Sequence, residues 1–175
     1  VIIGGIAASL LGKPRLTADL DAMLYASINQ IPEILSLAQE EGILPRIKNA
    51  ALFAQQHRVL LLRHQLSETD IDISLGILPF ELEIIERSLQ LEFGGLSIRL
   101  PTVEDLIILK AVAHRAQDWQ DIQGLVESHP KLDKERVINW VAQFAEILES
   151  PKILEHLTLI LKNEYELSNI KTISN

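Results

Sequence analysis

The chain has 175 residues, of which 47% are hydrophobic and 5% aromatic, and its 24 acidic and 16 basic residues give a formal net charge of −8. This length and composition predict a globular chain with an aliphatic core and exclude a disordered or low-complexity protein. The acidic balance, with a pI of about 5.1, argues against nucleic-acid binding over a broad surface, because such a surface repels phosphates. The absence of cysteine excludes a disulfide framework, thiol catalysis and cysteine-ligated zinc.

No hydrophobic stretch reaches the length needed to span a membrane. No signal peptide is visible, because the first residues are already typical of a core strand. We therefore expect a cytoplasmic protein without a membrane partner. A domain normally begins before its first central strand, so a chain that opens inside one favours a trimmed N-terminus.

The first twelve residues predict a strand, a glycine break and a short helix. Val1–Ile3 is an apolar β-branched run, Gly4 and Gly5 end it, and Ile6–Leu11 has helical composition. Gly12 is expected to cap this helix with a positive φ angle. A helix that starts directly after two glycines presents free backbone N–H groups, and the missing side chains allow a phosphate to approach them.

A second strand is predicted over Thr17–Tyr25 from its alternating pattern. Asp19, Asp21 and Met23 share one face, and the intervening apolar residues share the other. Two strand positions span roughly 6.6 Å between Cα atoms, so both carboxylates can reach one divalent ion. The alternative is an edge strand whose carboxylates are only solvated.

The order of these features resembles the DNA polymerase beta-like nucleotidyltransferase superfamily, whose signature is a strand, a glycine pair, a short helix and an Asp-x-Asp strand. The longer wording G-G-I-A…G-K-P-R-x-T-x-D-x-D is similar to small bacterial nucleotidyltransferases related to AbiE-type toxins. That version adds four positions, which are Gly12, Pro14, Arg15 and Thr17. The resemblance covers roughly residues 1–126. It implies an α/β fold, with a mixed β-sheet bearing three carboxylates, flanking helices and a helical C-terminal part.

The resemblance also implies a third metal carboxylate on a strand beside the first pair. The segment Asp70–Gly76 alternates strictly, with carboxylates at Asp70 and Asp72. Asp72 is the preferred third carboxylate because isoleucines flank it within the strand. Asp70 is the competing choice, and its place near a turn is also typical of a turn residue.

A long helix is predicted after Thr102, which is its N-cap, and it continues through Val126. The spacing of Lys110, His114, Asp118 and Asp121 places them on one face of that helix, a pattern usually explained by solvation. The wording of this segment again resembles the small nucleotidyltransferases. This implies that Lys110 reaches the triphosphate and that Asp118 or Asp121 helps to hold the site.

The remaining elements are predicted from periodicity and breakers. We expect helices over Glu33–Glu41, Asn49–Gln56, Phe80–Leu89, Lys134–Glu149 and Lys152–Tyr165, a strand over Arg58–Leu66, and a hairpin over Leu91–Leu100. Four basic residues flank the strand at 58–66, and they are either a solvated border or nucleotide contacts; they are His57, Arg58, Arg63 and His64. Residues 1–126 are expected to form the catalytic domain, with 127–175 packed on it as C-terminal helices.

The function implied by the resemblance is metal-dependent transfer of a nucleoside monophosphate from an NTP to an acceptor hydroxyl, with release of pyrophosphate. Mg²⁺ or Mn²⁺ is the expected cofactor, held by Asp19, Asp21 and Asp72. The expected phosphate-binding residues are Gly4, Gly5, Arg15, Thr17 and Lys110. The acceptor stays open between tRNA, a protein and a small molecule. The alternatives are a noncatalytic nucleotide-binding regulatory module and a toxin–antitoxin interaction protein.

The resemblance further implies a cognate antitoxin-like partner that restrains the enzyme. The two amphipathic helices within residues 134–165 are the expected docking surface, because they carry more apolar residues than one stripe requires. The residues expected to stay exposed are Ile138 and Phe144, or Leu157 and Ile160. The alternative is that both helices are used to cover the sheet.

Overall fold

The computed structural model describes residues 1–173, with side-chain surroundings described through residue 162. The chain divides into two compact units. The first comprises Val1–Ala7 and Arg15–Thr102, and the second comprises Ala8–Pro14 and the residues from Val103 onward. Helix α1 (Gly4–Leu11) contributes residues to both units. The units therefore divide after Thr102, whereas the sequence placed a domain limit after residue 126.

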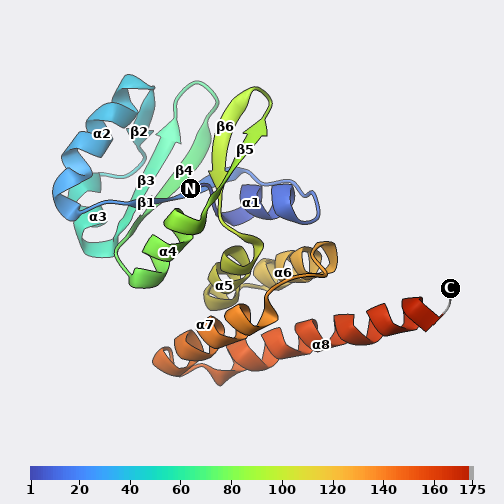
Figure 1. The fold of residues 1–175 in the computed structure, drawn as a ribbon. Coiled ribbons are helices and arrows are strands. Elements are labelled where there is room, and N and C mark those ends of the chain that lie inside the picture. Colours follow the sequence, from blue (N-terminus) through green and yellow to red (C-terminus); the bar gives the residue numbers. More distant parts are fainter. Residues whose placement is uncertain (174–175) are drawn as a thin grey trace. The chain divides into compact units, whose positions relative to one another are not determined.

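The first unit contains a four-stranded mixed sheet in the order β1-β4-β3-β2 (Figure 1). Strands β1 and β4 run parallel, and the β4–β3 and β3–β2 pairs are antiparallel. This confirms the predicted α/β class with a mixed sheet. After α1, the elements of the unit are β1 (Asp19–Tyr25), η1 (Ile28–Gln30), α2 (Ile31–Glu40), β2 (Ile43–Pro45), α3 (Ala50–His57), β3 (Val59–His64), β4 (Thr69–Gly76), α4 (Pro79–Arg87), β5 (Leu89–Phe93) and β6 (Leu96–Leu100).

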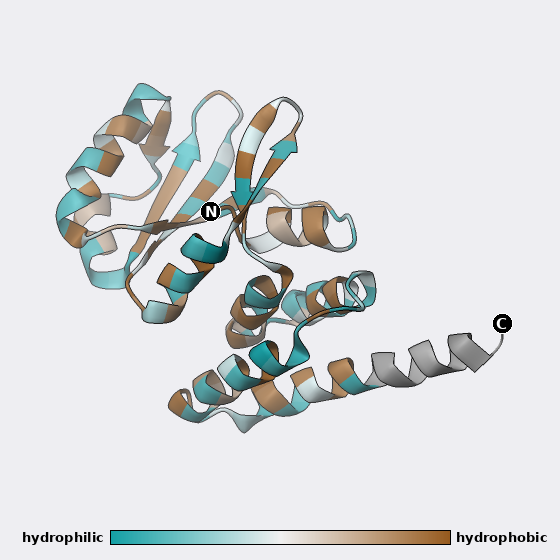
Figure 2. Cartoon of the chain, viewed as in Figure 1, coloured by the Kyte–Doolittle hydropathy of each residue, from teal (hydrophilic) through white to brown (hydrophobic). Residues whose placement is uncertain are grey.

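The hydrophobic core of this unit lies where α2 and α3 pack against the sheet. Its buried residues include Ile31 of α2, Ala54 of α3, and Leu60 and Leu62 of β3. Helix α2 begins with a proline in its first turn and is followed by Gly42, whose φ of +70° ends the helix. Figure 2 shows α2 with both polar and apolar residues, as expected for a helix with one buried side.

The predicted core strand at Val1–Ile3 is wrong. These residues form a single antiparallel bridge between Ile2 and Ala22, at the outer edge of β1. The Ile2 N–H donates instead to the Arg99 carbonyl of β6, at 2.8 Å. On the other side, the Ile3 N–H donates to the Asp21 carbonyl at 2.9 Å and the Met23 N–H donates to the Val1 carbonyl at 2.8 Å, and all three residues are half-buried. The segment therefore links β1 to the hairpin formed by β5 and β6.

The predicted positive φ angle at Gly12 is also wrong, and Gly4 has it instead, with φ +64°. Gly12 is needed for close packing within the second unit. A Cβ atom there would lie 3.2 Å from Leu125 Cδ2 and 3.0 Å from the Ala8 carbonyl oxygen. The short strand β2 follows α2 and has no counterpart among the predicted elements.

The second unit is helical and comprises, beside the end of α1, α5 (Val103–Ala113), α6 (Ala116–Ser128), α7 (Lys134–Ile147) and α8 (Pro151–Ile173). The single helix predicted through Val126 is wrong, because the chain breaks between α5 and α6. His114 adopts φ +55°, and the Arg115 N–H donates to Asp118 Oδ2 at 3.2 Å. An acidic residue at the third position of a helix whose side chain accepts from the N-cap backbone N–H is a signal for the start of a helix. Among residues 1–173, no helix is long and apolar enough to cross a bilayer.

The expected exposed residues of the last two helices are only partly accessible. Leu157 is fully buried, so its predicted exposure is wrong, whereas Ile138, Phe144 and Ile160 are half-buried. The large apolar residues that are exposed on these helices are others, namely Ile147, Leu148 and Leu159.

Candidate functional site

The acidic residues of β1 and β4 lie side by side on one face of the sheet. Strand pairing sets Asp19 beside Asp70 and Asp21 beside Asp72. Paired residues of adjacent parallel strands project to the same side, and the strands are roughly 4.8 Å apart. Because Ile71 of β4 packs against the α2–α3 core, the four carboxylates lie on the opposite face.

The carboxylates of β4 are paired with two arginines. Arg46, directly after β2, donates from Nη1 to Asp70 Oδ2 at 2.8 Å and from Nη2 to Asp72 Oδ1. Arg63 of β3 donates from Nε to Asp70 Oδ1 at 2.6 Å. Both oxygens of Asp70 are therefore engaged, whereas Asp72 Oδ2 has no hydrogen-bond partner in the described part of the chain. The hydrogen bond from Arg63, together with the charge of Arg46, holds the pKa of Asp70 below its usual value.

This difference bears on which acid is available to a cation. A carboxylate whose two oxygens each accept from a guanidinium group has fewer acceptor sites left for a metal ion than one that accepts at a single oxygen. Asp72 accepts from Arg46 through Oδ1 and is the register partner of Asp21. The contacts thus support the choice of Asp72 over Asp70 as the third carboxylate, which stays a prediction.

The glycine pair lies against the β1 carboxylates. Gly4 has a positive φ, and a Cβ atom at this position would lie 2.0 Å from Asp21 Oδ2. A Cβ atom at Gly5 would lie 2.6 Å from Thr17 Oγ1 and 3.0 Å from Arg15 Nη2. Only glycine fits at either position, so the start of α1 directly contacts Asp21, Thr17 and Arg15.

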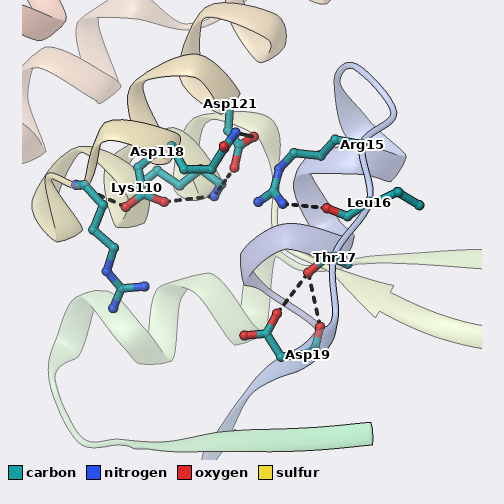
Figure 3. Close-up of polar contacts among 9 residues, drawn as sticks. Arg15, Leu16, Thr17, Asp19, Lys110, Asp118 and Asp121 are labelled. Atoms are coloured by element: carbon teal, nitrogen blue, oxygen red, sulfur yellow. Dashed lines mark hydrogen bonds and ion pairs between the residues drawn. The ribbon is translucent and has the colours of Figure 1, made fainter.

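Thr17 and Arg15 are held by short-range hydrogen bonds (Figure 3). Thr17 Oγ1 donates to Asp19 Oδ1 at 3.0 Å, and Arg15 Nη1 donates to the Leu16 carbonyl at 3.1 Å. The first unit thus gathers most of the predicted site, with a guanidinium, a hydroxyl, backbone N–H groups and carboxylates around the start of α1.

Lys110 belongs to the second unit, where it is 4% exposed between two buried carboxylates (Figure 3). Its Nζ atom donates to Asp121 Oδ2 at 2.6 Å and to Asp118 Oδ1 at 3.1 Å. In an unbroken helix, Asp118 and Asp121 would lie about 12 and 16 Å from Lys110 along the axis. The break at His114 therefore brings the three residues together. His114 is not part of this cluster and meets Trp119 edge-to-face, with ring centroids 5.2 Å apart.

The donor set of the first unit fits a hard cation in its chemistry, since Mg²⁺ and Mn²⁺ prefer carboxylate oxygens. Within the described part of the chain, however, no three acidic or histidine side chains are grouped closely enough to hold a metal ion. Asp19 is turned to Thr17, Asp21 lies against Gly4, and Asp72 is paired with Arg46. Metal binding by these three residues therefore stays a prediction.

Sequence reasoning missed Arg46, because it lies outside every motif and 26 residues before Asp72. Its only signal was a basic residue beside the turn at Pro45. Of the four basic residues flanking β3, Arg63 pairs with Asp70, His64 contacts Ser67, and Arg58 Nε donates to the Leu75 carbonyl at 3.3 Å. Their role as nucleotide contacts stays a prediction.

Comparisons with known proteins found a family model and solved structures that are similar to this chain. Residues 1–134 match a family model described as a nucleotidyltransferase of unknown function (DUF6036). The crystal structure of an antigenic nucleotidyltransferase-like protein from Paracoccidioides brasiliensis is similar with 14% sequence identity and a TM-score of 0.47, over 90% of this chain and 83% of that one. No curated protein matches the chain in sequence.

Proposed function

Starting from the fact that this chain belongs to the DUF6036 nucleotidyltransferase family, we propose that it transfers a nucleoside monophosphate from an NTP to an acceptor hydroxyl and releases pyrophosphate. One observation carries the proposal, namely that Asp21 and Asp72 are register partners on parallel strands. The start of α1 contacts the same Asp21 through Gly4. A carboxylate pair beside free helix N–H groups matches the two halves of a metal-bound triphosphate.

In this proposal Asp19, Asp21 and Asp72 hold Mg²⁺ or Mn²⁺. Such ions, when bound, stabilise the attacking and leaving oxygens of an in-line displacement. The backbone N–H groups of Gly4 and Gly5 hold phosphate oxygens.

The phosphates are further bound by Arg15 and Thr17, which lie beside Gly5, and the resemblance adds Lys110 to this proposed set. Asp72, whose ion pair with Arg46 involves Oδ1, accepts the proton of the acceptor hydroxyl. The hydroxyl oxygen forms a bond to the α-phosphorus, the bond from this phosphorus to the bridging oxygen breaks, and pyrophosphate leaves.

The acceptor in this proposal is a hydroxyl of tRNA, a protein or a small molecule, and a cognate antitoxin-like protein is the proposed restraining partner. Two alternatives keep part of these features. A regulatory module would bind Mg-NTP without chemistry, and an interaction protein would bind no nucleotide.

Isothermal titration calorimetry with each of the four Mg-NTPs separates these classes. The proposal predicts binding of at least one NTP by the wild type and much weaker binding by Asp21→Asn. Glu92→Gln, an equal charge change on the exposed strand β5, is the matched control and should bind as the wild type does. If no Mg-NTP binds at millimolar concentration, the interaction protein is the remaining alternative. If an Mg-NTP binds but no acceptor mixture gives pyrophosphate release, the regulatory module is the remaining alternative.

A further inference from the structure

We propose that Arg46 is an internal counter-ion of Asp72. A divalent cation must displace or outcompete Arg46 to bind the Asp72 carboxylate. The inference rests on the proposed function, because it takes Asp72 as a metal ligand. Arg46 is a positioning residue in this account.

The sheet sets Arg46 in the same transverse row as the carboxylates. Asp21 of β1 pairs with Asp72 of β4, and Asp72 pairs with Leu61 of β3. The Arg46 N–H donates to the Leu61 carbonyl at 3.0 Å, which continues this row past the end of β2. Residues of one row share a face, so the Arg46 side chain extends over Leu61 to Asp72.

The guanidinium binds both carboxylates of β4, with one terminal nitrogen for each. Asp70 has Arg63 as a second cation, whereas among the described residues Asp72 forms an ion pair with Arg46 alone. Loss of Arg46 therefore leaves Asp72 without an ion pair, whereas loss of Arg63 leaves the Asp72 pair intact. The two arginines form a matched pair of positions for an experiment.

The charges of this face explain what the pairing does. Four carboxylates on two neighbouring strands repel one another, and two arginines offset part of that repulsion. The same positive charge of Arg46 also repels an incoming divalent cation. At separations of about 5 Å in a water-like medium, this repulsion weakens cation binding by about tenfold. A bound triphosphate brings negative charge that offsets the repulsion, so cation and nucleotide binding become coupled.

The test is titration of Mn²⁺ alone into the protein, with free Mn²⁺ measured by electron paramagnetic resonance. Arg46→Gln should bind Mn²⁺ about tenfold more tightly than the wild type. Arg63→Gln should give a smaller gain, about threefold, because Arg63 contacts Asp70 and not Asp72. Adding Asp72→Asn to Arg46→Gln should abolish the gain. Circular dichroism establishes that each variant is folded.

A second measurement needs no charge-removing variant. In ¹⁵N-arginine-labelled wild type, Mg²⁺ should shift the Arg46 Nε–H resonance more than that of Arg63, with Arg46→Lys used to identify the signal. Equal shifts of the two resonances would overturn the counter-ion role, and so would a Mn²⁺ affinity in Arg46→Gln that is no higher than in the wild type. In either case the proposed function stays intact if Asp72→Asn still weakens Mn²⁺ binding. Absence of Mn²⁺ binding in every variant would overturn both.

Discussion

Asp21 and Asp72 are register partners on the parallel strands β1 and β4, and their side chains project from the face of the sheet opposite the α2–α3 core. Asp21 also lies so close to Gly4 that no side chain fits there.

The roles of the two acids of β4 are separable by substitution. Asp72→Asn should abolish nucleotidyl transfer while Mg-NTP still binds through Asp19 and Asp21. Asp70→Asn should keep most of the activity, because Asp70 accepts from two arginines and offers no free oxygen. Steady-state kinetics and calorimetry on both variants check this. Loss of transfer in Asp70→Asn with retention in Asp72→Asn would mean that Asp70 is the third carboxylate.

Gly4→Ala tests the contact between α1 and Asp21. Its Cβ atom would displace the Asp21 carboxylate, so we expect Mg-NTP to lose its stabilising effect in a thermal-shift measurement. Gly94→Ala is the matched control, since Gly94 has a similar φ of +58° but no atom within 4 Å of the added Cβ. Both variants incur the strain of a positive φ, about 1–2 kcal/mol. Nucleotide stabilisation that survives equally in both would contradict a phosphate site at Gly4.

Lys110→Met tests whether the buried ammonium is structural. The change removes the ammonium from which the buried carboxylates of Asp118 and Asp121 both accept, which should lower the free energy of unfolding by about 3–5 kcal/mol. Lys13→Met removes an exposed ion pair with Glu127 and should cost at most about 1 kcal/mol. Urea titrations compare the two. A small cost at Lys110 combined with a large loss of NTP affinity would show a mainly phosphate-binding role.

Acid should weaken the first unit through Asp70. The folded-state pKa of this carboxyl lies below its ordinary value of 3.8, mainly because of the hydrogen bond from Arg63. A depressed pKa means that the stabilising contribution is fully present above the unfolded pKa and is lost as pH falls through the folded pKa. The decline therefore lies below about pH 4, and Asp70→Asn should flatten it there. Stability curves measured by fluorescence from pH 2.5 to 6 check this, and identical slopes would refute it.

The elements that the sequence predicted well are those with a strict period. The alternation in β1 and β4, and the breakers around α2, fixed their positions to within a few residues. The break at His114 escaped prediction because neither proline nor glycine marks it, and a non-glycine residue there adopts a positive φ. Arg46 escaped because its partner Asp72 is brought near only by two antiparallel pairings. Long-range ion pairs of this kind have no local pattern.

Transfer of label from NTPs carrying ³²P at the α-phosphate tests the central claim most directly. Purified protein is incubated with Mg²⁺ or Mn²⁺, each NTP in turn, and mixtures of tRNA, protein and small-molecule acceptors. The account predicts acceptor-bound label with an equal amount of pyrophosphate for at least one NTP, and neither product with Asp21→Asn. Wild-type protein that binds Mg-NTP but gives no label transfer and no pyrophosphate with any acceptor mixture would contradict it.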